Sequence, residues 1–449
     1  MKLNHIEFSA KKQGMQLTKK QLIKLLLPVT ILLVAVYSVL SFPNEKLPLL
    51  TYLKSTTFWW VISVAVLIVL LMSNFYFFDR KNATHLRIVE IYLLWNIICI
   101  VRGMFVADGY WEWKGLIGNA FALLLPVVAY SATNKVMVQY VLSFYVKIGL
   151  PLFLIFALLI RTDAYGFYLI PVSFLLLFLP AFSLRQKIIL IFFTAVVLTA
   201  DLGARSTIIK FAIPLIFLLV YYFRNTLSVK TMEIIRLALL ILPIFFFVLG
   251  ITGIFNVFKM DEYIKTSYEG TGVDEQGNRV KIDLKTDTRT FIYVEVLQSA
   301  KKNNYWLFGR TPARGNESEA FGDILFELTG KYERLENEVA ITNVFTWTGI
   351  IGVILYFWIF FSASFLAVNR SENIYAKIIG LYVAFRWLYA WVEDVNNFSL
   401  NYLMLWIMLG LCFSFTFRGM TDREVAIWVR GIFDKRYLNP ENDTKKNEE

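Results

Sequence analysis

The residues of this chain that best suit chemistry on an anion are arginines at expected helix starts and tight turns. Arg289 follows the capping residue Asp287 and precedes apolar residues at helical spacing, so the sequence places it in the first turn of a helix. Free N–H groups and the helix dipole favour an anion there, and a guanidinium adds a bidentate partner for phosphate. The pattern indicates a phosphate-binding position, with an exposed arginine that binds nothing as the alternative.

A second arginine-rich segment follows within 306–315. Two glycines and a proline hold Arg310 and Arg314 on a constrained turn, which suits a backbone nest for phosphate oxygens. Gly-Arg turns are common, so this pattern alone is not specific. It makes the two arginines candidates for the same anion.

Ionisable residues also interrupt the apolar stretches of the chain, where they are costly and usually face a cavity or a partner. Asp201 and Arg205 are four residues apart and would share a face if one helix ran through both. Such pairing is one explanation, and a cavity that attracts phosphate is the other, because cations outnumber acids at this level. The cations are Arg102, Lys147, Arg205, Lys210 and Arg386, and the acids are Asp201, Glu393 and Asp394.

The elements that position these residues are apolar helices. Of 449 residues 57% are hydrophobic and only 18% charged, which excludes an ordinary soluble domain, and the apolar stretches of about 17 to 22 residues are long enough to cross a bilayer. A spanning segment must satisfy its own backbone hydrogen bonds, so each is a helix. We expect an all-α polytopic membrane protein with twelve spans at 22–42, 58–78, 88–104, 116–132, 139–160, 167–182, 188–204, 207–223, 237–255, 341–367, 378–391 and 402–417.

The distribution of lysine and arginine sets the orientation. These residues are concentrated in the connections on the side of the N-terminus, which predicts that both termini are cytoplasmic. The net charge of +11 is then mostly a topology signal, and we expect no nucleic-acid partner. The predicted regions are a cytoplasmic leader (1–21), nine helices (22–255), a periplasmic loop or lid (256–340), three helices (341–417) and a cytoplasmic tail (418–449).

The long polar loop has predicted structure of its own. Residues 273–285 read as a hairpin with its turn at 276–278, and a helix starts near Asp287. A second amphipathic helix covers about 317–329 and stops at Gly330. We expect the two helices to lie over the outer mouth of the bundle.

Cysteine and histidine are too scarce to build a metal site at the outer face. Cys99 and Cys412 fall inside predicted spans, and His5 and His85 fall on the cytoplasmic side. Chemistry at the outer face must therefore use carboxylates, arginines, lysines, tyrosines and backbone amides. We expect no metal and no cofactor.

Motifs between Asp201 and Gly352 resemble those of the O-antigen ligase and polymerase superfamily. These are Arg205 in Gly-Ala-Arg-Ser, Arg289 near a helix start, Leu-Phe-Gly at 307–309, and Gly-Ile-Ile-Gly at 349–352. The superfamily comprises membrane glycosyltransferases of GT-C type that use sugars carried on a polyprenyl pyrophosphate. Eleven residues before Gly349, where the family often has a histidine, this chain has Glu338.

The resemblance implies transfer of a glycan from undecaprenyl pyrophosphate to a sugar hydroxyl, at the periplasmic face of a bacterial inner membrane. The acceptor is lipid A-core for a ligase and a lipid-linked glycan for a polymerase, and the sequence does not separate the two. Fixed guanidiniums stabilise the pyrophosphate leaving group without a metal, and a single displacement inverts the anomeric centre. The implied roles are catalysis by Arg205, Arg289 and Glu338, with Glu336 as reserve base, and pyrophosphate binding by Arg205, Arg289, Arg310, Arg314, Lys210 and Arg386.

Three questions remain open. Glu338 is either the base that accepts the hydroxyl proton or a structural partner that holds Arg205, Arg289 or Arg334 in place. For the whole chain, the alternative to a glycosyltransferase is a twelve-span transporter or flippase for lipid-linked glycans. That class predicts related halves with the long connection after the sixth span. The outer aromatic residues Tyr110, Trp111 and Trp113 are either platforms for sugars or interfacial anchors.

Overall fold

A computed structural model describes residues 18–44, 55–263, 269–273, 279–283, 287, 289–393 and 396–437 of the chain. In the N-terminal half the elements are α2 (Lys19–Val39), α3 (Thr56–Phe77), η2 (Arg80–Asn82), α4 (Ala83–Met104), α5 (Tyr110–Leu124), η3 (Leu125–Val127), α6 (Val128–Ala132), α7 (Lys135–Phe144), η4 (Tyr145–Gly149), α8 (Leu150–Leu159), η5 (Thr162–Ala164), α9 (Tyr165–Leu176), η6 (Leu179–Ala181), α10 (Leu184–Ala200) and α11 (Arg205–Tyr222). The C-terminal half adds α12 (Val229–Ile251), α13 (Met260–Tyr263), β1 (Glu269–Val273), β2 (Arg279–Asp283), α14 (Thr290–Asn303), β3 (Asn316–Glu317), α15 (Gly322–Thr329), β4 (Glu333–Arg334), α16 (Ala340–Asn369), α17 (Ile374–Tyr389), α18 (Leu400–Phe413), α19 (Phe415–Arg418), α20 (Asp422–Phe433) and η7 (Lys435–Tyr437).

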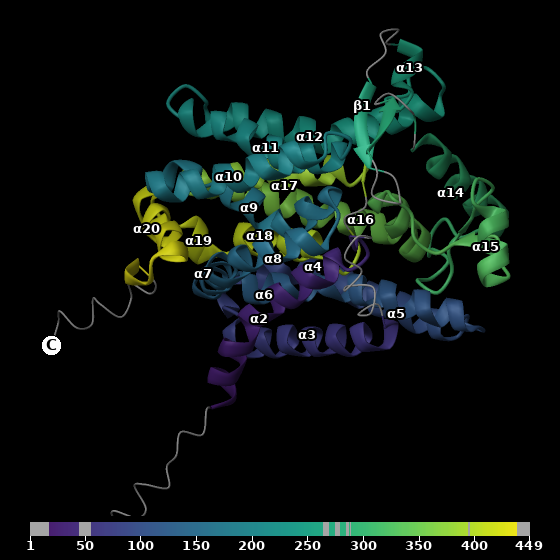
Figure 1. Ribbon diagram of the computed structural model, residues 1–449, viewed down its shortest axis with the longest axis horizontal. Coiled ribbons are helices and arrows are strands. Elements are labelled where there is room, and N and C mark those ends of the chain that lie inside the picture. Colours follow the sequence, from purple (N-terminus) through teal and green to yellow (C-terminus); the bar gives the residue numbers. More distant parts are fainter. Residues whose placement is uncertain are drawn as a thin grey trace, which may run out of the picture.

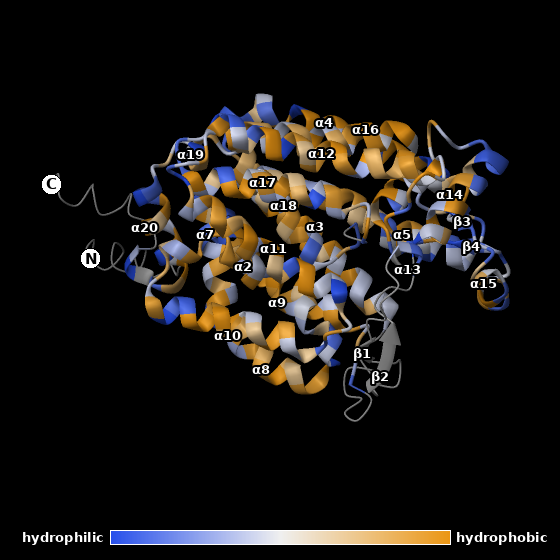
Figure 2. Ribbon diagram, turned by 90° about the horizontal axis from the view of Figure 1, so that it is seen from above, coloured by the Kyte–Doolittle hydropathy of each residue, from blue (hydrophilic) through white to orange (hydrophobic). Residues whose placement is uncertain are grey.

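The long helices form one bundle with a different structure at each end. The helices α14 and α15 lie at one end, called the loop end below, and α19 and α20 lie at the other (Figure 1). Apolar residues predominate along the bundle, whereas polar residues gather towards its two ends (Figure 2). Large apolar side chains such as Val61, Leu94, Leu158 and Ile234 are exposed on the outside of the bundle, as expected for helices that face lipid.

Eight helical segments of the described chain are long and apolar enough to cross a membrane: Lys19–Val39, Thr56–Phe77, Arg80–Met104, Tyr110–Ala132, Lys135–Leu159, Arg205–Tyr222, Val229–Ile251 and Ala340–Asn369. The other four predicted spans coincide with shorter helices, namely α9 (12 residues), α10 (17), α17 (16) and α18 (14). Pro180 explains one short helix, because it lies in the 3₁₀ turn that follows α9. The structure thus agrees with an all-α multi-pass membrane protein.

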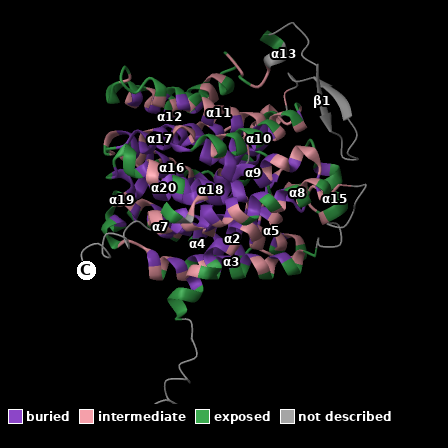
Figure 3. Cartoon of the chain, turned by 60° about the vertical axis from the view of Figure 1, so that its left-hand side comes forward, coloured by how far each residue is buried: buried purple, intermediate pink, exposed green. Residues whose placement is uncertain are grey.

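The core of the bundle is centred on α18. Every residue of this helix is buried, and α17 beside it has only two residues that are not. Figure 3 shows the buried residues concentrated around α16, α17, α18 and α9, and the exposed ones on peripheral helices. Because α17 is buried among these helices, its C-terminal end, at the loop end of the bundle, is held in place by its neighbours.

The polar loop agrees with the prediction in part. The strands β1 and β2 pair antiparallel, from Glu269 opposite Asp283 to Val273 opposite Arg279, and the predicted turn at 276–278 lies outside the described residues. The second helix, α15, starts at 322 and not near 317, because residues 316–317 pair with 333–334 as β3 and β4. It ends as predicted at Gly330, which has φ +74°.

The helix that would place Asp201 and Arg205 on one face does not form. The helix α10 ends at Ala200, and α11 begins at Arg205. In between, the Asp201 carboxylate accepts a hydrogen bond from the N–H of Gly203 at 2.8 Å. This local bond competes with the helix, so the two residues do not share an i, i+4 face.

Candidate active site

The C-terminal end of α17 at the loop end is the point where the candidate residues meet. We call residues 389–393 the α17 terminus. It receives hydrogen bonds from the loop before α14 and from the start of α16, and it donates one to the start of α11. The bonds are Arg289 Nε to Val392 O (3.0 Å), Ala340 N to Glu393 O (3.1 Å), Ile341 N to Ala390 O (3.0 Å) and Tyr389 OH to Ser206 O (2.9 Å).

Arg289 lies at the predicted helix start, but as the N-cap of α14 and not as a residue of its first turn. The Asp287 carboxylate accepts hydrogen bonds from the backbone N–H groups of Arg289 (2.9 Å) and Thr290 (3.0 Å), which caps α14. Burial alone would raise the pKa of Asp287, but hydrogen bonds from Thr290 and from the backbone outweigh burial and hold this pKa below its usual value. The capped turn fixes the backbone from which the guanidinium reaches the α17 terminus.

Glu338 is the partner of Arg289. Its Oε2 lies 2.5 Å from Arg289 Nη1, and its side chain is 56% exposed, so the carboxylate is open to solvent on one side. A second guanidinium approaches from β4, where Arg334 Nη2 lies 3.5 Å from Glu338 Oε1. The predicted base and the predicted phosphate ligand are thus in contact, and a carboxylate sits between two arginines.

The sequence offers Arg334 only as one of three arginines that Glu338 could hold in place. Its Nε donates to Glu336 O at 3.2 Å, and its guanidinium stacks over the Phe321 ring at 4.8 Å. The residue comes only four positions before Glu338, but it lies in an irregular segment for which the sequence has no periodic signal. Arg334 is the last residue of β4, which pairs with β3.

Lys210 belongs to a buried ion pair. Its Nζ lies 2.5 Å from Glu393 Oε1, and the other carboxylate oxygen accepts a hydrogen bond from the Tyr389 hydroxyl. The structure therefore gives Lys210 a protein partner. Arg205, the first residue of α11, lies next to Ser206, which binds the α17 terminus, and its side chain is exposed.

Arg386 is buried inside the bundle, with 1% of its side chain exposed. Its Nη2 donates to Asn401 Oδ1 at 2.9 Å, and its Nε has no hydrogen-bond partner. Within the described ranges no carboxylate forms an ion pair with it. A buried guanidinium without a counter-charge is costly. Because no carboxylate compensates it, its charge adds to the positive potential beneath the α17 terminus.

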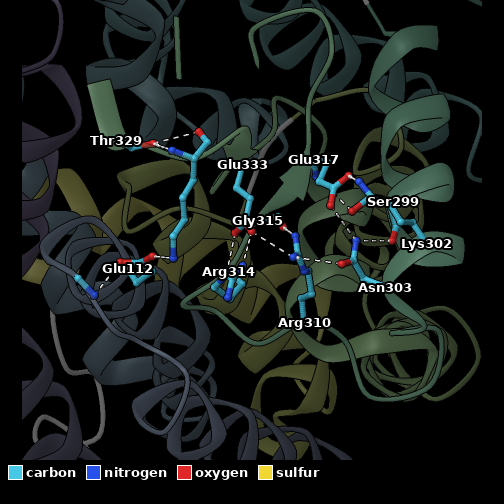
Figure 4. Close-up of polar contacts among 12 residues, drawn as sticks. Glu112, Ser299, Lys302, Asn303, Arg310, Arg314, Gly315, Glu317, Thr329 and Glu333 are labelled. Atoms are coloured by element: carbon cyan, nitrogen blue, oxygen red, sulfur yellow. Dashed lines mark hydrogen bonds and ion pairs between the residues drawn. The ribbon is translucent and has the colours of Figure 1, made fainter. Parts of the chain in front are cut away.

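Arg310 and Arg314 converge on Glu333 (Figure 4). Arg310 Nη2 lies 3.0 Å from Glu333 Oε1, and its Nη1 donates to Gly315 O at 2.6 Å. Arg314 Nε donates to the other carboxylate oxygen at 2.7 Å. The hydrogen bonds to Glu333 raise the pKa of Arg314. Pyrophosphate binding by these two residues stays a prediction, and in the structure they hold the loop together.

Two glycine motifs that are far apart in sequence meet in space. Gly309 (φ +69°) and Gly349 (φ +69°) face one another where α16 is kinked. A Cβ on Gly349 would lie 2.2 Å from Leu307 O, so only glycine fits there. Arg102 donates to Phe308 O at 2.7 Å and to Gly309 O, which gives this charge a structural role. The contact fixes the loop against the helix that follows Glu338.

Two cavities open at the loop end. The first, the apolar groove, has a volume of about 230 Å³ and lies between α12, α14 and α17 beside the start of α14; it is lined by Leu242, Pro243, Phe246, Phe247, Gly250, Ile251, Asn256, Val257, Phe258, Thr290, Tyr293, Val294, Leu297, Leu388, Trp391 and Val392. The second, the aromatic cavity, has a volume of about 730 Å³ and lies between α2, α3, α5 and the start of α18; its lining includes Tyr37, Ser38, Phe42, Trp59, Trp60, Trp111, Lys114, Asn119, Phe167, Leu335, Glu336, Phe398 and Asn401.

The arrangement can bind an anion beside an apolar chain and hold a carboxylate next to it. No cluster of three or more His, Cys, Asp or Glu side chains that could hold a metal ion occurs in the described part of the chain. Asp394, a further predicted acid, lies outside the described residues. Comparison with protein-family models, with characterised proteins and with solved structures finds no match to this chain.

Proposed function

We propose that the protein is a glycosyltransferase of the O-antigen ligase or polymerase type. It moves a glycan from undecaprenyl pyrophosphate to a sugar hydroxyl on a lipid A-core or lipid-linked acceptor. In this proposal the twelve apolar helices form a GT-C type bundle in a bacterial inner membrane, both termini are cytoplasmic, and the loop end faces the periplasm.

The observation that carries the proposal is the position of Arg289 between an apolar groove and a carboxylate. The guanidinium donates to Val392 O, and Val392 lines the apolar groove together with Thr290, the next residue after Arg289. On its other side the guanidinium contacts Glu338. A lipid pyrophosphate needs this combination, because an isoprenoid chain is apolar and its headgroup is a multivalent anion.

The ion pair between Arg289 and Glu338 suggests how donor binding prepares the reaction. Phosphate oxygens replace the Glu338 carboxylate on Arg289, which frees that carboxylate to accept a proton. The acceptor hydroxyl oxygen then attacks the anomeric carbon, the bond from that carbon to the pyrophosphate oxygen breaks, and the hydroxyl proton moves to Glu338. The bond electrons leave with the pyrophosphate, whose growing negative charge Arg289 stabilises, and the anomeric centre inverts.

The other cations take supporting places in the proposal. Arg205 is exposed at the start of α11, which the α17 terminus anchors through Ser206, and it serves as the second ligand of the pyrophosphate. Arg334 contacts Glu338 and helps to position it. Arg386 contributes positive potential from beneath, because no carboxylate of the described chain pairs with it. Glu393 pairs with Lys210, and Glu333 pairs with both Arg310 and Arg314.

A gene deletion followed by gel analysis of surface glycans tests the proposal. Loss of polymer on lipid A-core with accumulation of lipid-linked polymer identifies a ligase, and a core that carries one repeat unit identifies a polymerase. Complementation with Arg289→Ala should leave the defect in place. Arg224→Ala should restore the wild-type pattern, because Arg224 is exposed and its guanidinium donates to Tyr221 O and lies over the Tyr221 ring at the end of α11. An unchanged glycan pattern in the deletion strain would refute both forms of the proposal.

A further inference from the structure

We propose that the aromatic cavity binds the sugar residues of the acceptor, an inference that rests on the proposed function. The cavity is separate from the apolar groove, so the two substrates of a transfer reaction have separate places to bind. Its volume of about 730 Å³ is within the usual range for ligand sites of roughly 300–1,000 Å³. The lining residues and their hydrogen bonds identify the class of ligand.

The walls of the cavity combine aromatic rings with polar groups. Trp60 and Trp111 are half-buried and line it from two different helices, with Lys114 over the Trp111 ring at 4.6 Å. The electron-rich face of an aromatic ring attracts the C–H bonds on the apolar face of a pyranose. An acyl chain would gain nothing from the polar groups, so a carbohydrate fits this wall better than a lipid.

Two buried amides supply hydrogen bonds of fixed direction. Asn401 is 4% exposed, and its carbonyl oxygen is taken by Arg386, which leaves its NH₂ group for the cavity that it lines. Asn119 is 6% exposed and donates to Pro312 O at 2.9 Å. As far as the described chain shows, neither the Asn401 NH₂ nor the Asn119 carbonyl oxygen has a protein partner. One is a donor and the other an acceptor, and a sugar hydroxyl can satisfy both.

The aromatic cavity also lies next to the segment that carries the proposed base. Leu335 and Glu336 line it, and Glu338, two residues further along the same segment, contacts Arg289. The segment 335–338 therefore separates the aromatic cavity from the apolar groove. An acceptor glycan in the cavity would approach Glu338 from the side opposite the apolar groove. In this view Arg386 is a positioning residue, because it fixes the Asn401 amide.

Photo-crosslinking in cells tests the inference with the natural ligands as probes. Trp111 is replaced by p-benzoyl-phenylalanine, and Trp113 in the same helical turn is the matched control, because it is 41% exposed and does not line the cavity. A third position, Val294, lines the apolar groove. After irradiation the full-length protein is purified and the peptide adducts are analysed by mass spectrometry, with gel filtration to check folding.

We expect a hexose-bearing adduct at position 111 and none at 113. Asn401→Asp should lower its yield about tenfold, because the carboxylate still pairs with Arg386 but no longer donates to the sugar. The adduct should persist with Arg289→Ala, and its loss there would identify the donor glycan and overturn the acceptor assignment. A phospholipid adduct or no adduct at 111, or equal sugar capture at 113, would also overturn it. Position 294 tests the proposed function separately, because capture of polyprenyl lipid there supports it, and capture of phospholipid alone counts against it whatever occurs at 111.

Discussion

The ion pair between Lys210 and Glu393 gives the sharpest test of how the α17 terminus is built. Lys210 is 2% exposed and Glu393 12%, so both charges are largely desolvated. The sequence makes Lys210 a candidate pyrophosphate ligand, whereas the structure pairs it with a carboxylate. We predict that Glu393→Gln destabilises the protein, because it leaves a buried ammonium group without its counter-charge.

Removal of one partner from a buried pair costs about 3–5 kcal/mol. We expect the lower part of this range, because the Tyr389 hydroxyl and some solvent remain near the carboxylate position. With an unfolding entropy of about 2 cal/mol/K per residue, a chain of 449 residues loses roughly 1 °C in its denaturation midpoint for each kcal/mol. The midpoint of Glu393→Gln should therefore fall by about 3 °C.

A double-mutant cycle with thermal unfolding of the purified protein provides the assay. Lys210→Met should be destabilised as well, and Lys210→Met combined with Glu393→Gln should recover most of the loss, because no unpaired charge remains. Recovery of stability together with glycan transfer assigns Lys210 a structural role. If the double variant loses as much stability as the two single variants together, the coupling is refuted. A double variant that is stable but inactive would make Lys210 a candidate substrate ligand again.

Two further predictions concern the elements that hold Arg289 and Glu338 in place. Asp287→Ala should lower the free energy of unfolding by about 1 kcal/mol at neutral pH, because the hydrogen bonds of Asp287 to the start of α14 are lost. The pKa of Asp287 is depressed in the folded protein. The difference in unfolding free energy from wild type should therefore be complete above the ordinary pKa of 3.8 and disappear as the pH falls through the lower folded pKa. Gly349→Ala should prevent the turn at Leu307 from packing on α16, since the new Cβ would meet Leu307 O, and should lower the thermal midpoint and the activity together.

Each of these predictions has a clear opposite result. Denaturation curves of Asp287→Ala that match wild type at pH 7 would show that the cap does not contribute to stability. For Gly349→Ala the control is Gly118→Ala, which adds a Cβ where no atom lies within 4 Å and should keep or raise the midpoint. Equal midpoints for the two alanine variants would contradict the close packing at Gly349.

The sequence predicts the membrane class and two helix ends in the loop, because hydrophobic run length and capping residues are local signals. Asp287 caps the helix that carries Arg289, and Gly330 ends the second loop helix, as expected. The predicted start of α15 is wrong, because β3 pairs with β4. A shared helical face for Asp201 and Arg205 does not form, because the Asp201 carboxylate binds the Gly203 N–H and α10 ends at Ala200.

Most contacts of the site could not be predicted from the sequence, because they join residues far apart in the chain, and Arg289 is only one of three arginines that the sequence offers as a partner of Glu338. Glu338 contacts Arg289 from 49 positions away, and Lys210 reaches Glu393 across 183. No spacing rule covers such separations. The arginines at 310 and 314 have the residue types of a phosphate nest, and only the fold shows that Glu333 already occupies their guanidiniums. Trp111 and Trp113 look equivalent in the sequence, yet only Trp111 lines the cavity.

The most direct test of the central claim is the transfer rate of purified protein with an undecaprenyl-pyrophosphate-linked glycan donor. Wild type, Arg289→Ala, Arg289→Lys and the control Arg224→Ala are compared at saturating acceptor in lipid nanodiscs. We predict that Arg289→Ala loses about 100- to 1,000-fold in rate, since fixed charge on the leaving group is lost. Arg289→Lys should recover little, because a point charge replaces a bidentate fork, and Arg224→Ala should match wild type. A folded Arg289→Ala protein that transfers glycan at the wild-type rate would contradict the proposal.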